Sequence, residues 1–109
     1  MNKNALTILG AFCLAAPLAQ AAHPSFDCSK ASHEAEELIC KDSELAALDR
    51  SLAELYATVL KHTPADEQGT LKAEQRGWAK GRDDCWKSDD QRGCIKSEYE
   101  ARIRELKDR

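Results

Sequence analysis

The amino-acid sequence predicts an all-α fold: a small antiparallel bundle of three main helices and a short N-terminal helix, stapled by two disulfides. Three observations predict it. Apolar residues recur at steps of three and four, the period of one helix face, and no run alternates with the period of a strand. Residues 22–109 contain only four glycines. The expected helices are joined by a few residues each, which favours antiparallel neighbours.

The first two helices are each marked by a cap. A short helix is expected over about 33–40, capped by Ser32 and carrying three acids in its first turn, where they suit the helix dipole. Asp42 or Ser43 caps a longer helix over about 44–61. Its apolar stripe consists of Leu45, Leu48, Leu52, Leu55, Tyr56 and Val59.

The last two helices complete the bundle. The run Thr63-Pro64-Ala65-Asp66 is typical of a helix start and predicts a helix over about 64–86. One of its faces carries Leu71, Gln75, Trp78, Arg82 and Cys85. A cap within 88–91 precedes a final helix over about 91–107, whose apolar face is Ile95, Tyr99, Ile103 and Leu106. Gly77 and Gly81 lie inside the third helix, where each costs about 1 kcal/mol relative to alanine.

Residues 1–21 are expected to be a signal peptide that is removed after Ala21. Lys3 is followed by the almost entirely apolar stretch 5–18, and Ala19-Gln20-Ala21 has the small-x-small pattern of a cleavage site. The apolar stretch is shorter than the roughly 20 residues of a membrane-spanning helix. Phe12 before Cys13 does not suit lipid attachment. Residues 22–109 are therefore expected to form one exported domain, with no membrane span.

Removal of that segment leaves four cysteines: Cys28, Cys40, Cys85 and Cys94. An even number in a short exported chain indicates disulfides, and four cysteines allow three pairings. The local pairing, Cys28 with Cys40 and Cys85 with Cys94, is favoured because each bond closes a short segment at a helix boundary, with a stabilisation of about 2–3 kcal/mol. The spacings do not suit a C-x2-C zinc site or a C-x-x-C redox site. No metal and no cofactor is expected.

Four polar residues share faces with apolar ones: Asp49, Gln75, Arg82 and Arg102. A buried charge needs a partner, so Asp49 is expected to pair with Arg82 or Arg102 in a structural polar lock between helices. The alternative is an active site with Asp49 as its acid. The sequence has neither H-E-x-x-H nor G-x-S-x-G. No catalytic residue is assigned, and the protein is not expected to be an enzyme.

Several of these residues form a combined pattern. Phe26-Asp27-Cys28 is followed by Ile39-Cys40 and Leu48-Asp49, and then by Gln75, Trp78, Arg82-Asp83 and Cys85. This pattern resembles the LprI-type lysozyme inhibitor family of small exported bacterial proteins over nearly all of residues 22–109. The resemblance implies a periplasmic or secreted helical domain that binds lysozyme without catalysis and protects the cell wall. Gly77 and Gly81 depart from the family, which more often has ordinary helix formers there.

The charge distribution indicates the kind of partner. Residues 22–67 hold ten acids and four bases, and residues 68–109 hold nine acids and eleven bases. The net negative charge argues against nucleic acid, whereas an acidic half attracts a basic protein such as a c-type lysozyme. The contacting residues are expected to be Glu34, Glu36, Glu37 and Glu44. A competing hypothesis places Lys87 in the acidic cleft of the enzyme, and an alternative function is a general envelope protein-interaction module.

Overall fold

The computed structural model describes residues 23–109, so the expected signal peptide lies outside the described residues. In this range the chain forms four helices and no strand: α1 (Glu34–Lys41), α2 (Ser43–His62), α3 (Ala65–Asp83) and α4 (Gln91–Lys107). Two 3-10 turns, η3 (Cys28–Lys30) and η4 (Asp84–Lys87), complete the elements. The predicted all-α class is confirmed.

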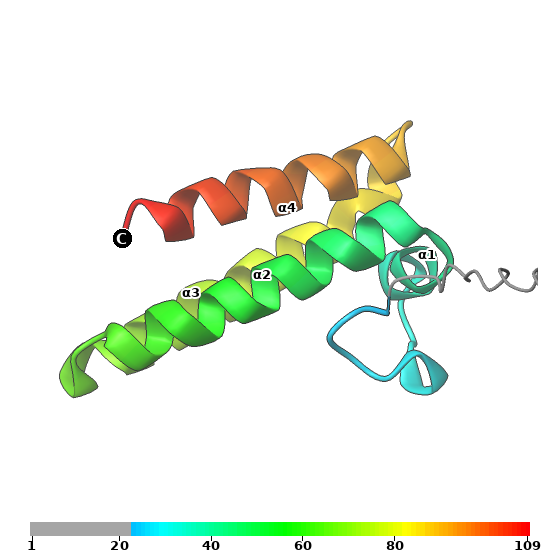
Figure 1. Ribbon diagram of the computed structural model, residues 1–109. Coiled ribbons are helices and arrows are strands. Elements are labelled where there is room, and N and C mark those ends of the chain that lie inside the picture. Colours follow the sequence, from blue (N-terminus) through cyan, green and yellow to red (C-terminus); the bar gives the residue numbers. More distant parts are fainter. Residues whose placement is uncertain (1–22) are drawn as a thin grey trace, which may run out of the picture.

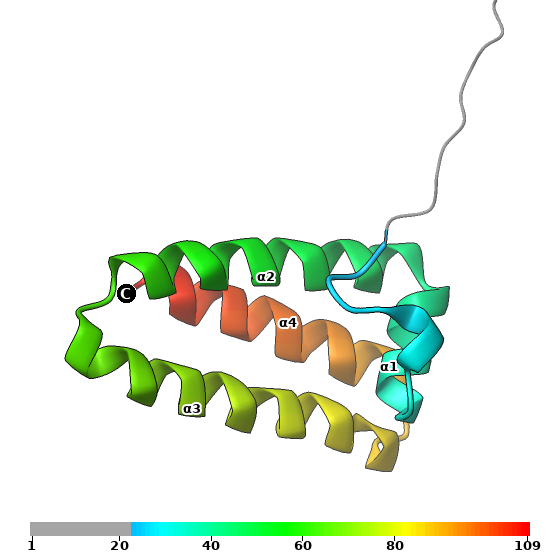
Figure 2. The ribbon, with the colours of Figure 1, turned by 90° about the horizontal axis from the view of Figure 1, so that it is seen from below.

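The three long helices lie side by side, and α1 sits across one end of them (Figure 1). Helix α4 packs against both α2 and α3 and lies behind the space between them (Figure 2). The α2–α3 turn is at the opposite end from α1 (Figure 2). This arrangement gives the bundle two different ends, which are called the α1 end and the turn end below.

The core takes side chains from every helix. Its buried members are Ala35, Ile39, Leu45, Leu52, Leu71, Cys85, Ile95, Tyr99 and Leu106. Residues of the predicted stripes such as Leu48, Tyr56 and Trp78 are half-buried around it. Burial of each large apolar side chain contributes roughly 1.5–3 kcal/mol, so the periodic faces of the helices supply the main drive for folding.

Both disulfides have the predicted local pairing. Cys28 bonds Cys40 with a Cα–Cα distance of 5.9 Å, and Cys85 bonds Cys94 with a Cα–Cα distance of 5.6 Å. The first ties η3 to α1, and the second ties η4 to the first turn of α4. The predicted staples are therefore confirmed, and both lie at the α1 end.

The third helix ends earlier than the sequence predicts. It stops at Asp83 rather than 86, and η4 turns the chain so that Cys85 reaches Cys94. Its start also differs, because Pro64 occupies the cap position and the Thr63 hydroxyl donates to the Val59 carbonyl, 2.6 Å away, closing α2 instead. A cross-link and a turn between helices decided these boundaries.

The caps at the α1 end are side-chain carboxylates. Asp42, one of the two predicted candidates, accepts from the Leu45 amide at 3.0 Å and caps α2. At α1 the cap position is His33 rather than Ser32, and the Ser32 amide donates to Glu36 Oε1 at 2.9 Å. Asp90 caps α4 by accepting from the Gly93 amide at 2.9 Å. Each of these bonds satisfies a backbone N–H near a helix start.

Within residues 23–109, none of the helices is both long enough and apolar enough to cross a bilayer.

Candidate binding surface

A buried polar network joins α2, α3 and α4. Asp49 Oδ1 accepts a hydrogen bond from the Tyr99 hydroxyl at 2.6 Å, and Arg82 Nη1 donates to the same hydroxyl at 3.1 Å. Arg82 Nη1 lies 4.0 Å from Asp49 Oδ1, so Tyr99 bridges the two charges. The remaining Arg82 donors, Nε and Nη2, bond Asp83 Oδ1 at 3.1 and 2.8 Å.

Burial and the contacts within the network together set the protonation of Tyr99 and Arg82. Burial raises the pKa of Tyr99, so its hydroxyl stays neutral and both donates and accepts. Burial alone would lower the pKa of Arg82, but the interactions with Tyr99 and Asp83 outweigh it and raise that pKa. An arginine that keeps its charge and a tyrosine that keeps its proton supply neither a general base nor a nucleophile.

The second arginine on the predicted face makes a separate pair. Arg102 Nε donates to Gln75 Oε1 at 2.9 Å, which links α4 to α3, and Arg102 Nη1 donates to Glu105 at 3.1 Å. The sequence left Arg82 and Arg102 as alternative partners of Asp49, and the structure places Arg82 beside it. Sequence reasoning had assigned Tyr99 only to an apolar face, although a buried tyrosine hydroxyl generally requires a partner.

Asp49 also holds the N-terminal arm, residues 23–26, against the bundle. Its Oδ2 accepts from both the amide and the hydroxyl of Ser25, each at 2.6 Å. Next to it, Arg50 donates to the carbonyls of His23 and Pro24 at 2.9 and 3.2 Å. Asp49 thus uses both oxygens to join the arm and Tyr99 to α2.

A shallow groove of about 350 Å³ lies between α2 and α3, beside the arm. Its walls include the aromatic rings of Phe26, Tyr56 and Trp78. The Trp78 Nε1–H donates to the Glu98 carbonyl at 3.0 Å, which fixes the indole edge-on to Tyr99. Of the polar groups that line the groove, those of Ser25, Asp49 and Arg82 belong to the network just described. Gln75 bonds Arg102, and Glu36 bonds the Ser32 amide.

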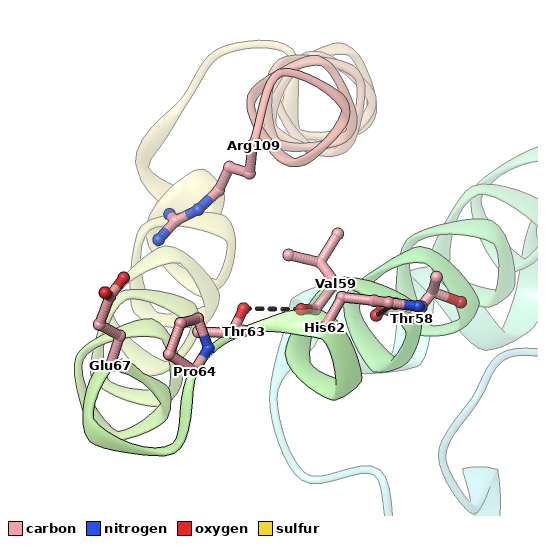
Figure 3. Close-up of a pocket in the computed structure, with 7 residues that line it drawn as sticks. All are labelled: Thr58, Val59, His62, Thr63, Pro64, Glu67 and Arg109. Atoms are coloured by element: carbon pink, nitrogen blue, oxygen red, sulfur yellow. Dashed lines mark hydrogen bonds between the residues drawn. The ribbon is translucent and has the colours of Figure 1, made fainter.

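A second hollow, of about 410 Å³, lies at the turn end (Figure 3). It lies among α2, the start of α3 and Arg109 (Figure 3). At its edge the Thr63 hydroxyl donates to the Val59 carbonyl, and Arg109 Nη1 donates to Glu74 at 2.6 Å. Thr63 thus closes the end of α2 and Arg109 ties down the end of the chain, which are structural roles.

Two of the four acids expected to contact a partner are engaged within the chain. The Ser32 amide bond lowers the pKa of Glu36, and the hydrogen bond from Arg92 lowers that of Glu44. Glu44 pairs with Arg92 at 2.5 Å and Lys96 at 3.2 Å. Glu34 and Glu37 are exposed on α1 and form no ion pair with another described residue. Of the expected acids, these two keep their charge available.

Lys87 lies on η4 with its side chain 62% exposed. Its Nζ is 3.8 Å from Asp84 Oδ1 and 5.7 Å from the centre of the Trp86 ring. Trp86 is 56% exposed, and every other large apolar side chain in residues 23–109 is buried or half-buried. The sequence reasoning missed it because position 86 was placed at the end of a helix. The available signal was its position: Trp86 directly follows Cys85 and so falls outside the helix face that carries Trp78, Arg82 and Cys85.

Among residues 23–109, no three His, Cys, Asp or Glu side chains converge in a way that could hold a metal ion.

Comparison with known proteins identifies relatives. Residues 28–106 match the family described as Lysozyme inhibitor LprI. The curated proteins named Lipoprotein LprI of Mycobacterium tuberculosis (strain H37Rv) and Mycobacterium bovis (strain AF2122/97) are 33% identical to this chain over 98 residues. That alignment covers 86% of this chain and 48% of each relative, so the chain spans about half their length. No solved structure matches. The matched segment includes all of helices α1 to α3 and nearly all of α4, and the chain belongs to the LprI family of lysozyme inhibitors.

Proposed function

We propose that this protein is a non-catalytic inhibitor that binds lysozyme, in the periplasm or after secretion, and so protects the bacterial cell wall. The family match over residues 28–106 carries the proposal, because that segment contains the folded core and all four disulfide cysteines. We therefore assign the proposed function to this folded domain.

The disulfides support an exported location. Both bonds close within one small domain, and such bonds persist in oxidising compartments. The signal peptide over residues 1–21 and the single domain over 22–109 remain predictions. Detection of a purified periplasmic form that begins at Ala22 by intact mass would test both.

The network around Asp49 supports inhibition by binding. Its acid is bonded to Ser25 and Tyr99, and its arginine is bonded to Tyr99 and Asp83. An inhibitor needs only an exposed surface that blocks the enzyme. The acidic half of the chain would attract a basic c-type lysozyme through long-range forces, which raise the association rate.

The direct test is an assay of cell-wall lysis by a c-type lysozyme in the presence of increasing amounts of purified residues 22–109. We expect lysis to slow with inhibitor concentration and the effect to weaken as salt is raised. Unchanged lysis at large molar excess and low salt would refute the proposal. A pull-down from periplasmic extract that instead recovers one native partner and no lysozyme would favour the general interaction module.

A matched pair of variants tests the acidic arm. Glu34→Gln with Glu37→Gln removes the two exposed acids of α1, and Glu54→Gln with Glu67→Gln removes two exposed acids elsewhere on the bundle. We expect the first pair to weaken inhibition several-fold more than the second at low salt, and the difference to fade at high salt, because rim charges act mainly on the association rate. Equal effects of the two pairs would exclude α1 as the contacting element.

A further inference from the structure

Trp86 is presented to solvent from a constrained position. Its neighbour Cys85 is buried and bonded to Cys94, so the turn η4 is tied covalently to α4. Helix α1 also packs against η4. The indole therefore projects from a backbone that is already ordered, and binding through it loses little conformational freedom. Tryptophan is the residue type most often found as the anchor of a protein interface.

The surroundings of the indole are polar and carry carboxylates. Two hollows adjoin it, one lined by Ser32, His33, Glu34 and Asp83, and the other by His33, Lys80, Asp83 and Asp84. Asp83 is neutralised by Arg82 at 2.8 Å. Glu34 has no ion-pair partner among residues 23–109, and Asp84 has only the loose pair with Lys87. An aromatic face with two available carboxylates beside it suits a cation.

The chain already places a cation of its own on this ring. Lys87 Nζ lies 5.7 Å from the ring centre and 3.8 Å from Asp84, with both side chains more than 60% exposed. A pair this exposed is weak, so a partner side chain can displace it. The position of Lys87 thus shows that the Trp86 ring can accept a cation, and the weakness of its pair leaves the ring open to a cation of the partner.

We infer that Trp86 anchors the lysozyme by stacking on an arginine or lysine of its surface, with Asp84 accepting hydrogen bonds from that cation and Glu34, in the adjoining hollow, adding negative charge. The inference rests on the proposed function and names the contact through which it acts. An arginine suits the site best, because its planar guanidinium both stacks on an aromatic ring and donates to carboxylates. The exposed Glu34 and Glu37 continue the acidic surface along α1.

This arrangement differs in one testable way from insertion of Lys87 into the acidic cleft of the enzyme. If Lys87 enters the cleft, its loss abolishes inhibition. If a partner cation replaces Lys87 on the ring, the lysine competes with the partner, and its loss leaves inhibition unchanged or tighter.

The experiment compares inhibition of a c-type lysozyme by the wild-type residues 22–109 and by W86L, W86F and K87A near physiological salt. Leucine keeps an apolar side chain but removes the aromatic face, whereas phenylalanine keeps a face. We expect W86L to raise the inhibitory concentration by about thirtyfold or more, the range of an interface anchor. W86F should inhibit at least severalfold better than W86L, and K87A at least as well as wild type. Circular dichroism should show that all variants fold, since Trp86 is mostly exposed.

These variants distinguish failure of the Trp86 contact from failure of lysozyme inhibition. Wild-type inhibition that survives in W86L overturns the inference and leaves the proposed function intact. Equal weakness of W86L and W86F overturns the cationic occupant, and loss of inhibition in K87A assigns the contact to the lysine instead. A wild-type chain that inhibits no lysozyme refutes the proposed function, and this inference with it.

Discussion

Replacing Tyr99 with phenylalanine tests whether its hydroxyl holds the three long helices in register. The substitution keeps the ring, and with it the edge-on contact to Trp78 at a centroid distance of 4.9 Å. It deletes one oxygen, which accepts from Arg82 Nη1 at 3.1 Å and donates to Asp49 Oδ1 at 2.6 Å. The change is thus confined to two hydrogen bonds between α4 and its neighbours.

The size of the effect follows from what each charged partner retains. A hydrogen bond to a charged group contributes about 1.5–3 kcal/mol, so two bonds set an upper range of about 3–6 kcal/mol. Asp49 keeps its two bonds from Ser25, and Arg82 keeps its two bonds to Asp83. The 4.0 Å gap between Asp49 and Arg82 can also shorten into a direct pair. We therefore expect a loss of about 2–3 kcal/mol in the free energy of unfolding.

Urea denaturation followed by circular dichroism measures this loss, and a thermal scan should show a midpoint about 10–20 °C lower for a domain of this size. Tyr56→Phe is the matched control, because the half-buried Tyr56 hydroxyl makes no hydrogen bond in the described part of the chain. It should change the free energy of unfolding by less than about 0.5 kcal/mol.

A double-mutant cycle with Asp49→Asn completes the test. If Tyr99 bridges the charges, the two substitutions couple by roughly 1–2 kcal/mol. A Tyr99→Phe protein as stable as the Tyr56→Phe control, or strict additivity in the cycle, would refute the bridge. Inhibition by the folded variant should stay close to wild type, because the inferred contact at Trp86 does not include Tyr99.

Three further predictions concern stability. The hydrogen bonds from Arg92 hold the pKa values of Asp42 and Glu44 below their usual range. The stability that these two carboxylates confer is therefore present above their unfolded-state pKa values near about 4, and it is lost as the pH falls through the lower folded-state values. Arg92→Gln should flatten the fall in urea midpoint between about pH 5 and pH 2, and an unchanged acid profile would contradict this. Gly77→Ala should stabilise the protein by about 1 kcal/mol in the same urea assay, because an added Cβ meets nothing within 4 Å. Gly93→Ala should bring no gain, or a loss of up to about 1 kcal/mol, because its Cβ collides with the carboxylate of Asp90 that caps α4 and the weakened cap offsets the better helix propensity of alanine. A gain at Gly93 or a loss at Gly77 would show that local space does not decide these effects. Arg50→Ala removes both hydrogen bonds to the carbonyls of the arm. The Ser25 amide should then exchange with solvent several-fold faster in hydrogen-exchange measurements, whereas the Leu52 amide should be unaffected. Equal exchange rates of the Ser25 amide in the variant and the wild type would mean that Asp49 alone holds the arm.

The helices and staples were accessible from the sequence because they depend on near neighbours along the chain. Apolar residues at steps of three and four indicated the buried faces of α2 and α4, and Asp42 indicated the start of α2. The two disulfides join cysteines only 12 and 9 residues apart. Short loops, helical period and caps are local properties, and the sequence displays them directly.

The features that were missed depend on contacts between distant residues. Arg92 pairs with Glu44, which lies 48 positions earlier in the sequence, and so engages a carboxylate that had been expected to contact a partner. Tyr99 reaches Asp49 across 50 positions, and only the packed bundle makes its hydroxyl a bridge. Trp86 was placed on a helix because nothing local showed that the Cys85–Cys94 bond would convert its last turn into η4.

The position of both disulfides at the α1 end makes the bundle unequal along its length. The turn end is held by weaker links, such as the Gln68 amide on the carbonyls of Leu60 and Thr63 and the pair between Arg109 and Glu74. Thermal fraying should therefore start at the turn and advance toward the cross-links, with amide protection along α2 rising from His62 to Leu45. Trp86 would keep its geometry in molecules whose turn end has already unfolded. On heating, the helical circular dichroism signal should therefore fall before binding to the enzyme is lost.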